Sequence, residues 1–453
     1  MTVSLLTACG PTRQEIKADV GAAVEAETPT VPESFSTPTS AEDVQVGWIE
    51  SFNDPALVKL VKEAQANNQN LRAAAANVER ARALAKRAGA ALTPDVDLTA
   101  GAARAGSPGD TVATTSDLGV GLQVSWELDV WGRVRAGARG AAASAQAVEA
   151  DYRYAQHSLA AATARAYFTA IEANLQTNNE GETVGVLEET MRIVNDKYEN
   201  GMGSSQDVPL ARSDLATARE RLTTAEGSYR DALRALEILL GRYPSAELAV
   251  RKLLPDVPPP PPAGVPSEVL ERRPDIVAAE RRVAAAFNTV QQAKAARLPK
   301  LSLTGNLGGA SSSLSSVTDS SSVTWRLATN LLAPIFDGGR LRAQVEIATA
   351  EQEQSLAAYG ETALKAFSEL ETSLDQGVVV AQREVDLKEA AEEAGEAFRI
   401  ANLRYQEGLS DLLSVLTIRQ RVIDAKRNLA SVQRLGLEQR INLHLALGGS
   451  WES

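Results

Sequence analysis

Side chains able to do chemistry are scarce in this chain of 453 residues, which has one cysteine, Cys9, and two histidines, His157 and His444. A single cysteine excludes an internal disulfide framework and a cysteine-based zinc site, and two separate histidines disfavour a histidine-rich metal centre. Both histidines lie in stretches of helical pattern, where packing or surface roles are more typical than metal ligation. Because no catalytic triad, phosphate-binding loop or metal cluster is recognisable, the sequence predicts a protein that is not an enzyme.

The one thiol lies in a sequence that resembles a lipid-attachment site. Leu6-Thr7-Ala8-Cys9 places small residues directly before a cysteine and after an apolar stretch, as in a bacterial lipobox. In that motif the cysteine becomes the lipidated first residue of the mature chain. No lysine or arginine precedes the apolar stretch, and the stretch is short for a full signal peptide. We therefore interpret residues 1–9 as a lipoprotein signal remnant with a covalent lipid at Cys9; the alternative is a chance cysteine in a disordered tail.

Composition indicates long helices rather than several compact cores. Hydrophobic residues make up 44% of the chain, but aromatic residues only 4%. The apolar content is thus mainly alanine, leucine and valine, which suits helices packed through small side chains. A formal net charge of −12 argues against a nucleic-acid binder, because phosphate backbones require clustered lysine and arginine. No run of 18 or more apolar residues occurs, so no transmembrane helix is predicted.

The two halves of the chain repeat one pattern. Arg133-Val134-Arg135-Ala136 recurs as Arg340-Leu341-Arg342-Ala343, at a spacing of 207, whereas Pro94 matches Pro299 at a spacing of 205. The change in spacing places an insertion of two residues in the second copy, after Pro299 and before Arg340. Self-similarity at a fixed period is the signature of a structural repeat, and we predict two tandem copies of one unit.

Each copy is predicted to contain the same elements in the same order. Asp54 and Pro55 suit the N-cap and first position of a helix that reaches Leu92. The elements that follow in the first copy are a hairpin at 95–127, a helix over 133–200 and a return helix over 209–240. Their counterparts in the second copy are a helix over 274–298, a hairpin at 300–332, a helix over 340–405 and a return helix ending at Leu447.

Three segments lie outside the repeats, which we place at 48–247 and 266–449. Residues 10–47 are rich in threonine, proline and glutamate, so we expect an extended strap. Residues 248–265 contain Pro258–Pro262, and we interpret them as a stiff linker rather than a peptide ligand. Residues 450–453 form a C-terminal tail.

Strict alternation gives each predicted hairpin an apolar and a polar face. A soluble protein would pack the apolar face on a core, but helices approaching about 100 Å cannot fold back over two small hairpins. Each strand has the length of a tilted membrane strand. Four strands cannot close a membrane barrel, whereas three chains would supply twelve. The polar face would then line a water-filled lumen with the side chains of Asp95, Asp97, Asp117, Glu127, Thr304 and Arg326.

Two tryptophans lie near strand ends of these hairpins. Trp126 and Trp325 occupy positions where a membrane barrel places interfacial aromatic residues. One tryptophan in each hairpin is also ordinary core packing, so this observation alone decides little.

Four longer motifs resemble the outer-membrane efflux factor family, the TolC-like channels, and within it the NodT-type lipoprotein branch. The resemblance covers nearly all of the chain from Trp48 to Trp451. The motifs are Phe52-Asn53-Asp54-Pro55-Ala56-Leu57 after Trp48, Leu270-x-Arg272-Arg273-Pro274-Asp275-Ile276 after Pro266, Pro334-Ile335-Phe336-Asp337-Gly338-Gly339-Arg340, and Leu445-Ala446-Leu447-Gly448-Gly449-x-Trp451. Together they are specific, although each alone would be weak.

The resemblance implies a mixed fold, in which a long α-helical barrel and four β-strands per protomer assemble as a homotrimer with a twelve-stranded barrel in the bacterial outer membrane. It also implies a lipid-anchored, passive exit duct that extends into the periplasm. The implied partners are a periplasmic adaptor (a membrane fusion protein) and an inner-membrane transporter, often of the resistance-nodulation-division (RND) class. The resemblance implies no cofactor beyond the lipid, no metal and no nucleic acid.

The same resemblance assigns roles to the two helical turns and to the helix after the second. The turns would be periplasmic tips that contact the adaptor, although glycine there also permits the tight turn itself. The tip residues are Gly201, Gly203, Ser204 and Ser205 in the first copy, within 201–208, and Gly408, Leu409, Ser410 and Asp411 in the second, within 407–411.

A periplasmic constriction is expected at Leu413, Thr417 and Gln420. Thr417 replaces an aspartate that is usual in the family, and Gln420 stands where an arginine is common. We therefore expect weak electrostatic closure and little aspartate-dependent cation block. Strong divalent block in single-channel recordings, lost on changing Leu413 or Thr417, would contradict this interpretation.

The main alternative is a soluble periplasmic coiled-coil adaptor or another structural interaction protein. An adaptor also has a helical hairpin, but its lipoyl and small β-barrel domains need many short strands, which the sequence does not show. Detergent-dependent solubility and a heat-sensitive trimer would favour the channel, whereas recovery in the soluble periplasmic fraction would favour the alternative.

Overall fold

A computed structural model describes residues 13–32, 34–37, 47–106, 114–263, 266–313, 315–317 and 319–449. The chain divides into two compact units, each built from three segments. The first unit comprises Met1–Pro29, Ala76–Asp151 and Asp275–Ala363, and the second comprises Thr30–Ala75, Tyr152–Pro274 and Leu364–Ser453. No helix within the described ranges combines the length and apolar character needed to cross a membrane.

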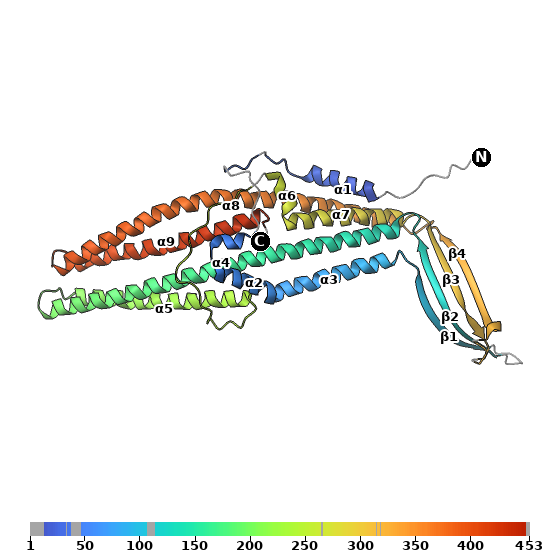
Figure 1. The fold of residues 1–453 in the computed structure, drawn as a ribbon, viewed down its shortest axis with the longest axis horizontal. Helices are drawn as coiled ribbons and strands as arrows, with labels where there is room; N and C mark the ends of the chain where they lie inside the picture. Colours follow the sequence, from blue (N-terminus) through green and yellow to red (C-terminus); the bar gives the residue numbers. More distant parts are fainter. Residues whose placement is uncertain are drawn as a thin grey trace. The chain divides into compact units, whose positions relative to one another are not determined.

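The first unit contains one antiparallel sheet with strands in chain order, β1-β2-β3-β4 (Figure 1). The strands are β1 (Asp95–Gly106), β2 (Thr114–Leu128), β3 (Lys300–Ser311) and β4 (Val323–Leu332). The two predicted hairpins are therefore neighbours in a single sheet, joined by pairing of β2 with β3. Strands β1 and β4 are its edges, and each has one side without a strand partner among the described residues.

Strand register locates the two-residue insertion of the second copy. Asp95 pairs with Ser125 in the first hairpin, and Lys300 pairs with Leu332 in the second. Asp95 and Lys300 are 205 residues apart, whereas Ser125 and Leu332 are 207 apart. Both hairpins therefore have the same register, and the two extra residues lie between β3 and β4.

Two long helices and two return helices complete the repeats (Figure 1). They are α4 (Arg133–Glu199) and α5 (Asp207–Leu239) in the first copy, and α8 (Arg340–Gln406) and α9 (Leu412–Ala446) in the second. Each long helix has 67 residues, about 100 Å at the α-helical rise. The return helix of the first copy begins at Asp207, before the predicted Pro209.

The helix predicted from Pro55 to Leu92 is interrupted, so the prediction of one continuous element is wrong. The chain forms α2 (Pro55–Asn67) and α3 (Gln69–Ala90), with Asn68 in an extended conformation at ψ 125°. The Asn68 amide donates to the carbonyl of Leu239, 3.0 Å away, and its Oδ1 accepts from the Leu71 N–H at 3.1 Å. A tertiary contact with the end of α5 thus coincides with the break.

The second copy breaks at the equivalent position. Arg273, 205 residues after Asn68, is extended between α6 (Val269–Arg272) and α7 (Pro274–Ala295). Here Pro274 contributes, because a proline disfavours helical geometry in the residue before it. The Arg273 guanidinium lies 3.4 Å from the carbonyl of Ala446, near the end of α9. Both copies therefore join the end of the return helix to the break in the first helix.

Residues 10–47 were predicted to be extended, but Arg13–Glu27 forms helix α1. Most of the threonine and proline that indicate a strap follow this segment, whereas the segment itself contains alanine, glutamate and valine and no proline. Thr28, directly after α1, lies 3.3 Å from the Tyr359 hydroxyl. Farther along, the Ser36 N–H donates to the carboxylate of Glu371 at 3.2 Å.

The main hydrophobic core of the second unit lies where both copies meet. The 3-10 helix η1 (Trp48–Phe52) buries three side chains there beside α2, α4, α5 and α9. Asp54 fixes the start of α2, because its Oδ1 accepts from the N–H groups of Ala56 and Leu57. Its Oδ2 accepts from the Tyr167 hydroxyl at 3.0 Å and from Arg251 at 3.2 Å. The Asn-Asp-Pro motif is thus part of this core.

Candidate functional site

One face of the sheet exposes a continuous set of apolar side chains. Antiparallel partners share a face, so the pairs Val96–Val124, Leu98–Leu122 and Leu307–Trp325 lie together. Leu98 is 75% exposed and Trp325 78% exposed within the chain. A contiguous apolar surface of this kind marks an interface with protein or lipid.

The opposite face is polar. The register places Asp97 opposite Gln123, Ser125 opposite Thr304, and Asn306 opposite Arg326. All six side chains predicted to face a lumen lie on this face, namely Asp95, Asp97, Asp117, Glu127, Thr304 and Arg326. Their facing a lumen remains a prediction, since it depends on how chains assemble.

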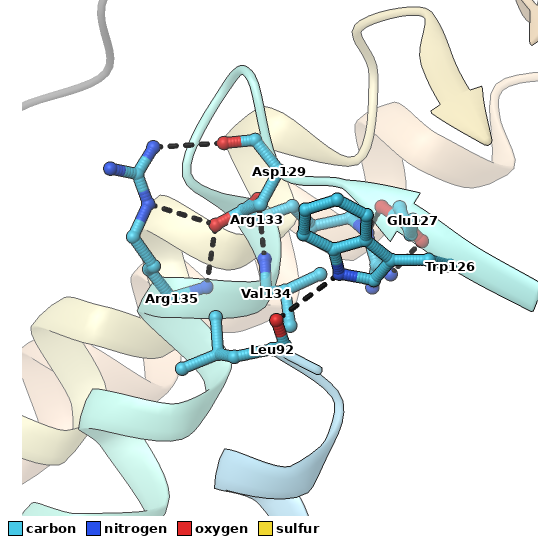
Figure 2. Close-up of polar contacts among 7 residues, drawn as sticks. All are labelled: Leu92, Trp126, Glu127, Asp129, Arg133, Val134 and Arg135. Atoms are coloured by element: carbon cyan, nitrogen blue, oxygen red, sulfur yellow. Dashed lines mark hydrogen bonds and ion pairs between the residues drawn. The ribbon is translucent and has the colours of Figure 1, made fainter. Parts of the chain in front are cut away.

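Glu127 differs from the other acidic residues of this face because it is paired. Arg133, the first residue of α4, donates two hydrogen bonds to its carboxylate, of 2.8 and 2.6 Å (Figure 2). This hydrogen bonding raises the pKa of Arg133. Glu127 therefore fixes the passage from β2 to α4 and contributes less free charge to the face than sequence alone suggested.

Asp129 caps the same helix from the connecting segment. Its carboxylate accepts from the N–H groups of Val134 and Arg135, at 2.9 and 2.8 Å, and also from the Arg135 side chain at 3.0 Å (Figure 2). Burial favours the neutral acid, but these donors outweigh it and lower the pKa of Asp129. A negative charge at a helix N-terminus is also stabilised by the positive end of the helix dipole.

Two tryptophans connect the strand ends to the chain before each hairpin. The Trp126 indole donates to the carbonyl of Leu92 at 3.1 Å (Figure 2). The Trp131 indole donates to the carbonyl of Pro299 at 2.7 Å. The sequence singled out Trp126 for its position near a strand end, but it gave no signal for the partner of Trp131.

The two helical tips have the same backbone design. Gly201 and Gly408 have φ values of +72° and +77°, and the following N–H groups, of Met202 and Leu409, donate back to the carbonyls of Lys197 and Arg404 at 2.8 Å. This is the Schellman ending of an α-helix, which requires a left-handed residue. Gly203, Ser204, Ser205 and Ser410 complete the short connections. Asp411 caps α9 through the Ser414 N–H at 2.7 Å.

The predicted constriction residues form one stripe on α9, in which Leu413 and Thr417 are exposed and Gln420 is half-buried, with its Oε1 accepting from Arg221 at 3.2 Å. Leu413, Thr417 and Gln420 are four and three residues apart, which places them on the same helical face, and Leu413 is 63% exposed. The Thr417 hydroxyl donates to the Leu413 carbonyl at 2.8 Å. Gln420 donates to Asp424 at 3.0 Å, so the stripe continues to an acidic residue that sequence reasoning missed. Helical periodicity from Leu413 could have found it.

Within the second unit, α4 and α9 run side by side through a series of polar contacts. Arg165 donates to Asn442 at 2.7 Å, and Arg427 donates to the buried carboxylate of Glu180 at 2.7 Å. Farther toward the tips, the Arg419 guanidinium donates to the carbonyl of Thr183. Burial lowers the pKa of Arg419 to about 10. These contacts join the first copy to the second within one chain.

The remaining predicted site residues are easily placed. Cys9 lies outside the described residues, as does the tail at 450–453. His157 and His444 lie on α4 and α9, and His444 is buried against Trp48. Among the residues that the structure describes, no three histidine, cysteine, aspartate or glutamate side chains are grouped as metal ligands.

A model of the outer membrane efflux protein family matches residues 60–242 and 265–449, which are the two repeats. The chain belongs to the outer membrane efflux protein family. It is similar to the pyoverdine export outer membrane protein OpmQ of Pseudomonas aeruginosa, with 34% identity over 99% of this chain and 95% of that protein. It is also 31% identical to the toluene efflux pump outer membrane protein TtgC of Pseudomonas putida, over 92% and 88% of the two chains.

Solved structures of similar fold are outer-membrane channels. The channel OprN superposes with a TM-score of 0.88 at 28% identity, over 98% of this chain and 100% of that chain. The MtrE channel of Neisseria gonorrhoeae, solved in its open state, gives a TM-score of 0.85 at 29% identity, over 93% and 96%. The predicted TolC-like fold, helical with four strands and two tandem repeats, is confirmed.

Family membership places this protein in the outer membrane as an efflux channel, and it favours the exit duct over a soluble adaptor. The family consists of transport proteins rather than enzymes. An efflux channel needs an outer surface for lipid, an inner surface for solutes and a periplasmic end. The apolar face, the polar face and the two tips are the surfaces available for these roles.

Proposed function

We propose that three copies of this chain form one outer-membrane duct, with β4 of each chain paired to β1 of the next. The observation that carries the proposal is the sheet, which has an exposed apolar face, a polar face and two unpaired edges. Unpaired edge strands invite pairing with another chain, and strands in lipid must satisfy all their backbone groups. Three sheets of four strands give a closed sheet of twelve.

The dimensions of the apolar face support its contact with lipid. From Leu118 to Leu128 the strand advances ten residues, about 33 Å along its direction. A strand tilt of about 40° reduces this to a height of about 25 Å, the apolar height of outer-membrane proteins. The polar face would then surround the conducted solute.

We further propose that Cys9 carries a lipid anchor and that the two tips contact a periplasmic adaptor, which connects the duct to an inner-membrane transporter of the RND class. The lipobox-like sequence supports the first point, and the duplicated tips support the second, since three chains present six similar turns. Because its relatives serve pyoverdine export and toluene efflux, we infer that this duct exports compounds of the pyoverdine or aromatic-solvent type.

The test is complementation of a strain that lacks its own copy of this gene, with intracellular accumulation of a fluorescent pump substrate as the measurement. Wild-type protein should lower accumulation, whereas Gly408→Val, which strains a residue at φ +77°, should not, although it reaches the outer membrane. Cys9→Ser should leave the protein unlabelled by radioactive palmitate. A wild-type protein that sediments as a monomer in mild detergent would overturn the trimer.

A further inference from the structure

Because the chain is an internal repeat, each contact between its two copies predicts an equivalent contact between neighbouring chains. In a ring of three chains, first and second copies alternate, so every first copy lies between two second copies. One of these junctions is inside the chain, and the other is between chains. A residue pair that joins the copies within a chain therefore has a counterpart, shifted by 207 residues in opposite senses, between neighbours. This inference rests on the trimer proposed above.

One contact inside the chain, close to the tips, combines a cation with an aromatic ring. Lys197, in the last turn of α4, donates from its Nζ to the carbonyl of Tyr405 at 2.6 Å. The same Nζ lies 4.0 Å from the centre of the Tyr405 ring. The ammonium thus binds the C-terminal end of α8 and the ring face together, and Tyr405 is 6% exposed.

The counterparts of these two residues retain their chemistry, but their side chains have no partner among the residues that the structure describes. Position 197 corresponds to Arg404 and position 405 to Tyr198, so a cation and a tyrosine recur. Tyr198 is 50% exposed. Across the described part of the chain, neither the Arg404 guanidinium nor the Tyr198 ring has a hydrogen bond, ion pair or ring contact.

A second contact between the copies also has an exposed counterpart. Arg419 on α9 is buried, and its guanidinium donates to the carbonyl of Thr183 on α4. The counterpart of Arg419 is Arg212 on α5, which is exposed and, within the described ranges, has no side-chain partner. The counterpart of Thr183 is Ala390 on α8, and any residue can supply the backbone carbonyl that the contact needs.

A third contact keeps its charges. Lys426 and Glu182 lie 3.7 Å apart, and their counterparts are Arg219 and Glu389. Arg219 bonds Glu188 in the same chain, in a pair that is more than half exposed. Exposed pairs of this kind contribute little, so Arg219 can change partner at low free-energy cost. Farther from the tips the charges are not kept, since Glu172 and Arg434 correspond to Val379 and Gly227.

We propose that, near the tips, α8 of one chain meets the end of α4 and the start of α5 of the next chain. Arg404 of the first chain then lies on Tyr198 of the next, and Arg212 of the next chain lies on the α8 backbone at Ala390. The partner that this surface fits is a second copy of the same chain. The missing neighbour explains why equivalent positions differ in burial. Tyr405 and Arg419 are buried within the chain, whereas their counterparts Tyr198 and Arg212 are exposed.

Cysteine cross-linking of the full-length protein in membranes tests this joint, in a Cys9→Ser background. The double variant Tyr198→Cys with Arg404→Cys, treated with a short bis-maleimide, should give covalent dimers and trimers on a denaturing gel. The matched control, Lys197→Cys with Tyr405→Cys, should link within one chain and leave the monomer band in place. Each single variant should give no ladder.

A second measurement tests the joint without relying on the cysteine variants, which could fail to fold. Arg404→Ala and Arg212→Ala should lower the temperature at which the detergent-solubilised trimer dissociates, whereas Arg230→Ala, on the same helix as Arg212 but farther from the tips, should lower it less. A wild-type trimer without cross-linking through positions 198 and 404 would overturn the joint and leave the proposed function standing. Absence of any trimer would overturn both.

Discussion

At the residue scale, equivalent positions of the two copies have acquired different chemistry. Glu237 is buried, and its carboxylate accepts from the N–H groups of Ala246, Glu247 and Leu248 at 2.8 to 3.2 Å. These donors hold Ala246 at a φ of +60°, which is unusual for a residue with a side chain. The counterpart of Glu237, 207 residues later, is His444. A buried anion in one copy thus corresponds to a buried imidazole in the other.

His444 should make the second unit sensitive to acid. It stacks on Trp48 with ring centres 5.5 Å apart. Burial, followed by the positive charge of Arg440, lowers its pKa from 6.5 to about 3. Between these values the unfolded chain binds a proton that the folded chain does not. The contribution of neutral His444 to the free energy of unfolding is therefore fully present above pH 6.5. It is lost as the pH falls toward 3, by at most about 1.4 kcal/mol per pH unit.

The substitution His444→Phe checks this prediction, because phenylalanine keeps the ring stack and cannot be protonated. The thermal unfolding temperature of the detergent-solubilised protein should fall less steeply from pH 6.5 to pH 3 in His444→Phe than in the wild type. His157→Phe serves as a control for removal of a histidine from a long helix. Identical slopes for the wild type and His444→Phe would assign the acid sensitivity to other groups.

At the element scale, periodicity predicted which segments are helices and strands but not where tertiary contacts interrupt them. Alternation located both hairpins, and the helical pattern of apolar residues located the long helices. The break at Asn68 is only weakly indicated by Asn67, Asn68 and Asn70, which are poorer helix formers than alanine or leucine. Its tertiary cause is the end of α5, about 170 residues away. In the second copy, Pro274 predicts the start of a helix, but it does not predict the short helix α6 that precedes the break.

The contact between α5 and the break can be tested through Gly241. It has a φ of +72°, and a Cβ atom there would lie 2.6 Å from the carbonyl oxygen of Asn67. Gly241→Ala should therefore destabilise the protein by about 1–3 kcal/mol, measured by denaturant unfolding. The control is Gly185→Ala in α4, where a Cβ atom meets nothing within 4 Å. It should stabilise the helix by about 0.5–1 kcal/mol, and equal effects would contradict the proposed packing.

Adjacent residues of β1 test the two faces of the sheet. Leu98 lies on the apolar face and Thr99 on the polar face. Leu98→Arg should reduce the yield of assembled protein in the outer membrane, since arginine facing lipid costs about 2–4 kcal/mol at the membrane centre. Thr99→Arg should assemble normally, because its side chain points toward water. Heat-sensitive trimer on unboiled gels is the measurement, and a reversed order would exchange the assigned faces.

At the scale of the whole molecule, the chain is incomplete by itself in two places. Its sheet has two unpaired edges, and near the tips Arg404, Arg212 and Tyr198 have no partner among the described residues. In the proposed trimer, duplication explains both, because one polypeptide supplies only half of the alternating junctions of the ring. Sequence reasoning reached the ring through strand counting, but it could not identify these residues, since their significance depends on the contacts that their counterparts make.

The charge of the polar face predicts the ion selectivity of the assembled duct. Four acidic residues, Asp95, Asp97, Asp117 and Glu127, share this face with the basic residues Lys300 and Arg326. Because Glu127 is paired with Arg133, three unpaired carboxylates oppose two cations, and the net charge of the face is 2 − 3 = −1 per chain, or −3 for three chains. A lumen of this sign concentrates cations, and salt screens the effect over about 10 Å at 0.1 M.

Reversal potentials in planar bilayers under a KCl gradient should show cation preference that weakens as the salt concentration rises. Replacing both Asp95 and Asp97 by asparagine should reverse the preference, because the face then carries a net charge of 2 − 1 = +1 per chain. Asp231→Asn, on α5 and away from the sheet, should leave it unchanged, and anion preference in the wild type would place a different surface in the lumen.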